Sequence, residues 1–154
     1  MQINELRFTD SVVYSIEEIA RYIEINGKDF FSKFTTALTA EEFRTLDVIK
    51  YNPDICQRDL AKLILRDRVR AGRILDSLEE KELIRRFGDM KNKRLVKKME
   101  LTDKGSEIHQ EIFEKLLPIH AKMSEKISPE QVKELKKLLG LLKEALVEMT
   151  EINV

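Results

Sequence analysis

The sequence predicts a mainly α-helical protein with one small β-hairpin. Three observations lead to this prediction: apolar residues recur at helical spacing, helix-start signals precede several of these stretches, and two short β-prone segments flank a polar tip. An apolar content of 42% with 36% charged residues fits a folded protein with a highly charged surface. With 154 residues, the chain can form one domain or two small lobes that share helices.

The first two helices are predicted from an apolar stripe and from a capping box. The stripe consists of Val12, Val13, Ile16, Ile19, Ala20 and Ile23. Thr39 and Glu42 have the spacing of a capping box, in which each side chain accepts a hydrogen bond from the other residue's backbone N–H. We expect Phe43, Leu46 and Ile49 to form the inward face of this second helix, and Asn52 and Pro53 to end it.

Two further helices follow in close succession. A short helix is expected to bury Leu60, Ala61 and Ile64. Asp67 is a favourable N-cap for the next one, whose predicted buried positions are Ala71, Ile74, Leu75 and Leu78.

The second half of the chain is expected to form the hairpin and then two long helices. Residues 83–87 and 95–101 are the predicted strands, with the polar sequence GDMKNKR between them as the tip. Thr102 is expected to start a long helix, which Pro118 should kink or interrupt. The last helix is expected to have Ser128 as its N-cap, Pro129 as its first residue and Gln131 as its third.

The terminal helices carry more apolar residues than a small lobe can bury. On the last helix they cover more than one face: Leu135, Leu138, Leu139, Leu141, Leu142, Ala145 and Leu146. A dimer in which these helices pack across a two-fold axis would cover the surplus. An intramolecular bundle that consumes all of it is the alternative.

Positive charge is concentrated in the middle of the chain. Residues 58–98 hold 14 Lys and Arg against 7 Asp and Glu, although the whole chain has 28 of each sign. A neutral protein with one basic block is typical of binding to a phosphate backbone.

The helix after Asp67 has the residue pattern of a DNA-recognition helix. When its apolar positions face the core, Val69, Arg73 and Asp76 point away, flanked by Arg66, Arg70 and Gly72. Arginine can bind guanine through two hydrogen bonds, and Val69 can contact a thymine methyl group. At Gly72 the missing side chain would let the backbone approach the duplex. The predicted DNA contacts are Gln57, Arg58, Arg66, Arg68, Val69, Arg70 and Arg73, together with Lys91, Lys93 and Arg94 on the hairpin. Arg94 is the candidate for insertion into a narrow minor groove.

The order of these parts resembles the MarR family of winged-helix transcriptional regulators. The resemblance rests on LTAEEFRTLDVI, CQRDLA, RAGRILDSLEEKELIRR and KNKRLVKKMELTDKG, in which Leu101, Thr102 and Gly105 match the family's LTxxG. It implies a winged helix-turn-helix DNA-binding lobe over residues 39–101 and dimerisation helices over 1–38 and 102–154, within a single chain of 1–154. It also implies a homodimer on a pseudo-palindromic operator of double-stranded DNA, most often a repressor released by a small effector.

The sequence departs from the family pattern in this lobe, among other places where Val69, Arg70 and Gly72 replace the small hydroxyl residues common in the recognition helix. The wing usually carries Asp-x-Arg, and here Asn92, Lys93 and Arg94 stand in its place. Cys56 stands where Ser or Thr often caps the short helix. Near a helix N-terminus, Cys56 is either a reactive thiol or simply a small buried residue.

An effector crevice between the dimerisation helices and each DNA-binding lobe is implied by the resemblance. Its candidate lining residues are Tyr14, Tyr22, Phe31 and His109, which would suit a small aromatic or lipophilic molecule. Core packing for the aromatic residues, and ordinary helix-surface positions for His109 and His120, are the alternatives.

Other classes of function have little support in the sequence. Two histidines and one cysteine, widely spaced, provide no zinc cluster, and no phosphate-binding loop or catalytic constellation is present, so we expect neither metal, cofactor nor enzymatic activity. No apolar run approaches the roughly 18 residues of a membrane span, no secretion signal is visible, and the single cysteine suits the cytoplasm. The alternative function is a winged-helix protein-interaction module without sequence-specific DNA binding.

Overall fold

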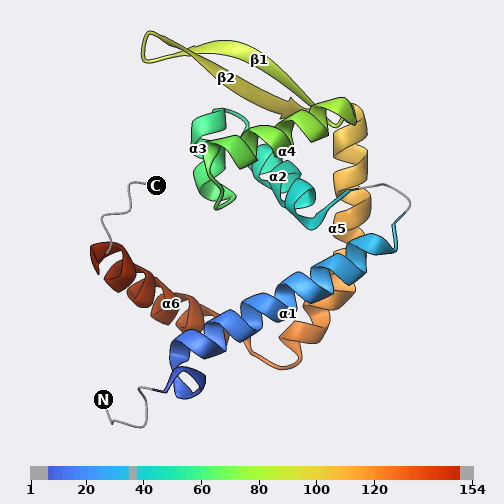
Figure 1. The fold of residues 1–154 in the computed structure, drawn as a ribbon. Coiled ribbons are helices and arrows are strands. Elements are labelled where there is room, and N and C mark those ends of the chain that lie inside the picture. Colours follow the sequence, from blue (N-terminus) through green and yellow to red (C-terminus); the bar gives the residue numbers. More distant parts are fainter. Residues whose placement is uncertain (1–6, 35–37, 150–154) are drawn as a thin grey trace. The chain divides into compact units, whose positions relative to one another are not determined.

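The computed structural model describes residues 7–34 and 38–149, and it divides the chain into two compact units, Met1–Thr45 and Leu46–Val154. The first unit contains the 3-10 helix η2 (Phe8–Asp10), helix α1 (Val12–Ser32) and the start of α2 (Ala40–Tyr51). The second contains the rest of α2 and the elements α3 (Gln57–Leu63), α4 (Arg68–Glu80), β1 (Ile84–Lys91), β2 (Arg94–Leu101), α5 (Asp103–Ser124) and α6 (Pro129–Met149) (Figure 1). The predicted mainly helical fold with one hairpin is confirmed.

Helix starts follow the capping signals of the sequence. Thr39 N–H donates to Glu42 Oε2 at 2.8 Å and Glu42 N–H donates to Thr39 Oγ1 at 3.1 Å, which is the predicted capping box. Ser128 and Gln131 form the same reciprocal pair at the start of α6. Thr102 caps α5 by accepting from Gly105 N–H at 3.0 Å. Each cap satisfies backbone groups that the first turn of a helix leaves unpaired.

The core of the second unit lies where α2, α3, α4, the hairpin and the start of α5 meet. The side chains that are at most 2% exposed include Leu46, Ile49, Leu60, Ala71, Leu75, Leu78, Leu83, Ile84, Met99 and Ile112. Of the predicted inward positions on α4, all four are buried. The helical spacing in the sequence therefore identified the face of α4 that packs against α3 and β1.

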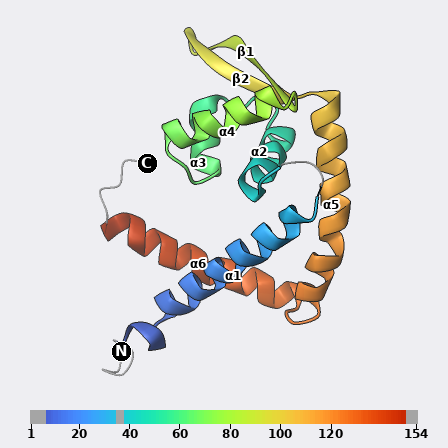
Figure 2. The same cartoon turned by 45° about the vertical axis from the view of Figure 1, so that its right-hand side comes forward.

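The hairpin differs from its predicted boundaries. β1 extends to Lys91 and β2 begins at Arg94, so that Asp89, Met90 and Lys91 pair with Val96, Leu95 and Arg94 instead of forming a loop. The turn is only Asn92 and Lys93, with φ angles of 52° and 62°. Two consecutive left-handed residues give a turn whose twist matches the strands, and Asn tolerates this conformation well. Both views show the resulting long hairpin extending beyond α3 and α4 (Figures 1 and 2).

Pro118 does not interrupt the long helix, so of the two outcomes expected from the sequence only a kink stays a prediction. α5 is one helix from Asp103 to Ser124 with Pro118 inside it. Proline removes one backbone hydrogen bond, but Pro118 and Glu114 are exposed, so water can satisfy the freed carbonyl group.

Helices α1 and α6 bury no residue. Their exposed side chains include Val12, Ile19, Ile23, Leu135, Leu138, Leu141, Leu146 and Val147, each at least 46% accessible. The predicted terminal dimerisation segments also include residues 1–6, 35–37 and 150–154, which lie outside the described part of the chain. Among the described residues, no helix has both the length and the apolar character that crossing a membrane requires.

Candidate nucleic-acid interface

Helix α4 presents a polar, positively charged face opposite the face that it buries. Asp67 fixes its start, because the carboxylate accepts from Arg70 N–H at 2.8 Å. Val69 is 66% exposed, and Arg68, Arg70 and Arg73 are exposed beside it. Arg66, in the turn between α3 and α4, donates from Nη1 to Leu65 O at 3.0 Å. The first turns of α4 therefore carry the side chains that the sequence assigned to base and phosphate contacts.

Gln57 of α3 and Gly72 of α4 lie next to each other where the two helices pack together. Gln57 is the first residue of α3, and a Cβ atom at position 72 would lie 3.6 Å from Gln57 Nε2. Gln57 Oε1 is buried and has no hydrogen-bond partner among the described residues. Gly72 therefore lies beside Gln57 at a distance that an alanine side chain would also allow, and the close approach of Gly72 to a duplex remains a prediction.

The cations near the base of the hairpin are held by carboxylates. Arg85 pairs with Glu100 across the two strands. Arg86 binds Asp76 at 2.6 Å and Glu79 at 3.0 Å, both on α4. Because these carboxylates neutralise the two charges locally, Arg85 and Arg86 offer little charge to a ligand, and the half-buried Arg86 also joins the hairpin to α4.

Two lysines nearer the tip are also paired. Lys98, with a side chain only 13% exposed, binds Asp89 at 2.9 Å, and Lys91 Nζ donates to Asp59 Oδ2 at 3.0 Å. In contrast, within residues 7–34 and 38–149, Lys93, Arg94 and Lys97 form no ion pair with a carboxylate. Of the three hairpin residues predicted to contact DNA, Lys91 is therefore engaged within the protein, while Lys93 and Arg94 remain available.

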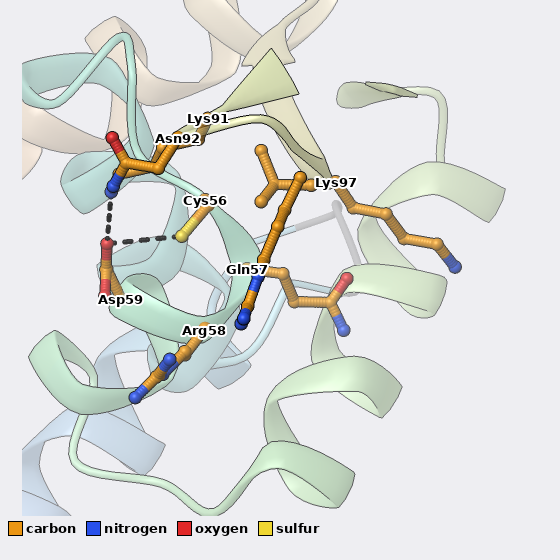
Figure 3. Close-up of a pocket in the computed structure, with 9 residues that line it drawn as sticks. Cys56, Gln57, Arg58, Asp59, Lys91, Asn92 and Lys97 are labelled. Carbon is orange, nitrogen blue, oxygen red and sulfur yellow. Dashed lines mark hydrogen bonds and ion pairs between the residues drawn. The ribbon is translucent and has the colours of Figure 1, made fainter. Parts of the chain in front are cut away.

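A hollow of about 620 Å³ lies between α3 and the hairpin (Figure 3). It is lined by Cys56, Gln57, Arg58, Asp59, Lys91, Asn92, Arg94, Val96 and Lys97. Four of these side chains are cationic and one is acidic, so the hollow is positively charged. The hollow brings Gln57 and Arg58 of α3 together with Lys91 and Arg94 of the hairpin. All four residues were predicted from the sequence to contact DNA, although they come from two separate segments.

The comparison with protein families decides the identity of this lobe. A model of the MarR family matches residues 38–96. The chain carries a MarR-family domain. No curated protein sequence matches the chain.

Solved structures agree with the MarR-family domain and extend the likeness to almost the whole chain. The transcriptional regulator SlyA is 26% identical with a TM-score of 0.73, covering 89% of this chain and 94% of its own. MepR of S. aureus, in a DNA complex, is 22% identical with a TM-score of 0.76 (88% and 96% covered). FabT of Streptococcus pneumoniae, also in complex with DNA, is 22% identical with a TM-score of 0.67 (90% and 97% covered). The chain has the fold of MarR-family transcriptional regulators, and the hairpin is its wing.

Cys56 is buried at the N-terminus of α3. It occupies the N-cap position but its side chain makes no capping hydrogen bond. Instead, the thiol donates to Asp59 Oδ2 at 3.2 Å, and the Cys56 backbone bridges to Lys98 of β2. Of the two explanations offered by the sequence, this position, 5% exposed, is that of a small packed residue.

His109 is fully buried, so the expectation of a helix-surface histidine is wrong for this residue. Its Nε2 lies 2.8 Å from Asp47 Oδ1, and its Nδ1 lies 3.1 Å from Lys50 Nζ. Because an ammonium group only donates, Nδ1 accepts from Lys50 and Nε2–H donates to Asp47. The Phe113 ring stacks on the imidazole at a centroid distance of 6.1 Å. His109 thus links α5 to α2, whereas His120 is exposed as expected.

The other three candidate crevice residues lie on α1, in the first unit. Tyr14 packs edge-on against Phe8 at 5.4 Å, and Phe31 packs against Phe43 at 5.8 Å. Tyr22 is 60% exposed. Ring packing accounts for Tyr14 and Phe31, and an effector crevice that includes these residues and His109 stays a prediction.

The residues that hold the wing in place could not be identified from the sequence. Asp59 joins the hairpin to α3, and Arg86 joins it to α4. Lys98 of β2 joins the two strands of the hairpin by binding Asp89 of β1. Lys91 and Asp59 are 32 residues apart, and no periodic pattern connects them. Such pairs become visible only when the chain is folded.

Proposed function

We propose that the chain is a homodimeric, DNA-binding transcriptional repressor that a small-molecule effector releases from its operator. The observation that supports DNA binding most is the set of available cations on two adjacent elements of a winged-helix lobe. Among the described residues, Arg68 and Arg73 on α4 and Lys93 and Arg94 at the wing form no ion pair with a carboxylate. Uncompensated cations release counterions from DNA on binding, whereas cations already paired within the protein contribute much less.

The proposed docking places α4 in the major groove and the wing in the neighbouring minor groove. Arg68, Val69, Arg70 and Arg73 would meet base edges and phosphates, because they occupy the exposed side of the first turns of α4. Arg94 would enter the minor groove, and Gln57 and Arg58 would meet the backbone between the two elements. The winged-helix DNA-binding lobe would then be residues 39–101, with dimerisation helices in 1–38 and 102–154.

A second copy of the chain is the proposed cover for the apolar side chains of α1 and α6. Both helices consist largely of alternating charged and apolar residues, yet neither buries a side chain within one chain. Exposed apolar surface of this extent is typical of an interface between subunits. Sedimentation equilibrium should therefore find a dimer, and a monomer at micromolar concentration would contradict this part of the proposal.

DNA binding can be tested by fluorescence-anisotropy titration against the DNA upstream of the chain's own gene and against a scrambled duplex, at several salt concentrations. A steep salt dependence with at least about a thousandfold preference for the native fragment would support a specific regulator. Arg94→Ala should weaken binding to all sequences and lower the salt slope by about one unit. Arg70→Ala should instead reduce the preference for operator over scrambled DNA.

Two results would contradict this function. If both substitutions left DNA affinity unchanged, the docking of α4 and the wing would be wrong. If the protein bound no DNA even at low salt, a winged-helix protein-interaction module would explain the fold better. For the effector, release of labelled operator by small aromatic or lipophilic molecules is the matching assay, and Tyr22→Ala should weaken that release without changing DNA affinity.

A further inference from the structure

One contact ties the tip of the wing to the helix-turn-helix. Asp59 Oδ2, on α3, accepts from Lys91 Nζ at 3.0 Å and from the Cys56 thiol at 3.2 Å. Figure 3 shows these side chains meeting at the edge of the hollow, with Asp59 coming from α3 and Lys91 from the hairpin. Lys91 is the last residue of β1, directly before the turn.

The Asp59 carboxylate is also held by a second contact, within α3 and its N-cap. Cys56 is 5% exposed, and its backbone bridges to Lys98, so its thiol cannot move without disturbing the start of α3. Asp59 is thus oriented by a buried donor before Lys91 binds it. In agreement, the pKa of the Asp59 carboxyl lies below its ordinary value, mainly because of the hydrogen bond from Lys91 and then because of the one from Cys56.

The restraint acts where the wing has least other support. Gly88, Asp89, Met90 and Leu95 are all exposed, so the outer part of the hairpin is not packed into the core. Lys91 is directly opposite Arg94 in the strand register. Fixing Lys91 on α3 therefore also fixes the position of Arg94 and of the turn relative to α3.

We propose that Asp59 is a positioning residue for DNA binding: by holding Lys91 on α3, it orients the wing tip so that Lys93 and Arg94 can reach the duplex. Lys91 then serves as the anchor of the tip and not as a phosphate contact. This inference rests on the proposed DNA-binding function. It assigns an acidic residue inside a basic surface to the binding apparatus, although that residue repels phosphate.

The sign of one mutational effect separates this role from simple electrostatics. If Asp59 acted only through its charge, Asp59→Asn would remove repulsion and tighten DNA binding. If it anchors the wing, the same substitution weakens binding, because the tip must be ordered when the complex forms. The side chains of Asp59 and Lys91 are 43% and 47% exposed, so we expect a modest loss of about threefold to fivefold in affinity.

The test uses the full-length protein with Asp59→Asn, Lys91→Gln and the double variant, titrated by anisotropy at several salt concentrations. Each single variant should lose about threefold to fivefold in affinity, and the double variant no more than either single one, because both break the same contact. The salt slope should stay unchanged in Lys91→Gln, whereas Arg94→Ala lowers it by about one unit. Lys91→Arg should restore binding.

Asp54→Asn is the control for charge alone: Asp54 lies in the same lobe, its side chain is 95% exposed, and its contact with Lys98 is long, at 3.8 Å, whereas Asp89 holds Lys98 at 2.9 Å. This control should leave affinity unchanged or slightly increased. NMR titration of Asp59 gives a readout independent of DNA, since its carboxyl pKa should rise toward the ordinary value in Lys91→Gln.

Three results would overturn the inference. One is tighter DNA binding by Asp59→Asn, of the kind expected for Asp54→Asn. Another is a drop of about one unit in the salt slope of Lys91→Gln, which would make Lys91 a phosphate contact. The third is an additive double variant. If the unsubstituted protein bound no DNA at any salt concentration, the proposed function itself would fail, and the positioning role would fail with it.

Discussion

Of the glycines in the described residues, Gly105 is the one at which an added methyl group should lower the stability of the fold most. It lies in the first turn of α5, and a Cβ atom there would be 2.0 Å from Leu83 O and 2.9 Å from Leu83 C. Both atoms belong to the backbone at the start of the wing, so no side-chain rotation relieves the clash. In Gly105→Ala, α5 and the segment before β1 must therefore separate by roughly 1 Å.

The expected loss of stability follows from what this separation disturbs. Overpacking of a tight contact costs roughly 1–3 kcal/mol. Two hydrogen bonds across the same contact would also lengthen: Thr102 N–H to Leu83 O, now 3.1 Å, and Thr102 Oγ1–H to Glu82 O, now 2.7 Å. At roughly 0.5–1.5 kcal/mol each, they bring the expected loss to about 2–6 kcal/mol. A loss of this size is a large part of the roughly 5–15 kcal/mol that stabilises an ordinary domain.

Urea unfolding followed by far-UV circular dichroism, at one fixed protein concentration, measures this loss. Gly72→Ala is the matched control, because its Cβ atom would lie 3.6 Å from Gln57 Nε2, an ordinary contact. Alanine is the better helix former, so the control should gain roughly 0.5–1 kcal/mol. If Gly105→Ala unfolded within about 0.5 kcal/mol of the unsubstituted protein, the argument from the Leu83 contact would be refuted.

Two further predictions concern the wing turn and the response to acid. Lys93 has a φ of 62°, so Lys93→Gly should raise the free energy of unfolding by about 1 kcal/mol while it lowers the salt slope of DNA binding; Lys93→Ala should change only the slope. The pKa values of Asp59, Glu79 and Asp89 are lowered by hydrogen bonds from Lys91, Arg86 and Lys98, respectively. Their stabilising contribution is therefore complete above the ordinary carboxyl values of 3.8 and 4.5, and it is lost as the pH falls through the lowered folded-state values. Urea unfolding at neutral pH and near pH 3 should show this decrease, and equal stability at both would argue against these ion pairs.

The sequence by itself determined the helices and the orientation of α4. Capping boxes at Thr39 and Ser128 and the N-caps at Asp67 and Thr102 are local signals, and the structure forms all of them. The buried face of α4 follows from helical periodicity, because every fourth residue of a helix returns to the same side. The opposite side of α4 was therefore predicted to be exposed and to contact DNA. This prediction did not require knowing which elements pack against the buried face.

Local signals were insufficient where two conformations compete over a few residues. GDMKNKR is polar and contains glycine, so it was expected to be a loop, yet most of it pairs as strand around a two-residue turn. Pro118 was expected to kink or interrupt its helix, and whether a proline interrupts a helix depends on whether the freed carbonyl group can reach water. Burial of His109 was missed for a related reason: its partners Asp47 and Lys50 lie on a helix about 60 residues earlier.

Only the tertiary structure decided which charges are available. The sequence presents Lys91, Lys93, Arg94, Lys97 and Lys98 as one basic cluster, and nothing in their spacing distinguishes one from another. In the folded chain, Asp59 and Asp89 pair with Lys91 and Lys98 and leave the other three without a carboxylate partner among the described residues. The physical reason is that secondary structure depends on neighbours within a few positions, whereas an ion pair depends on distances in space that only the packed fold sets.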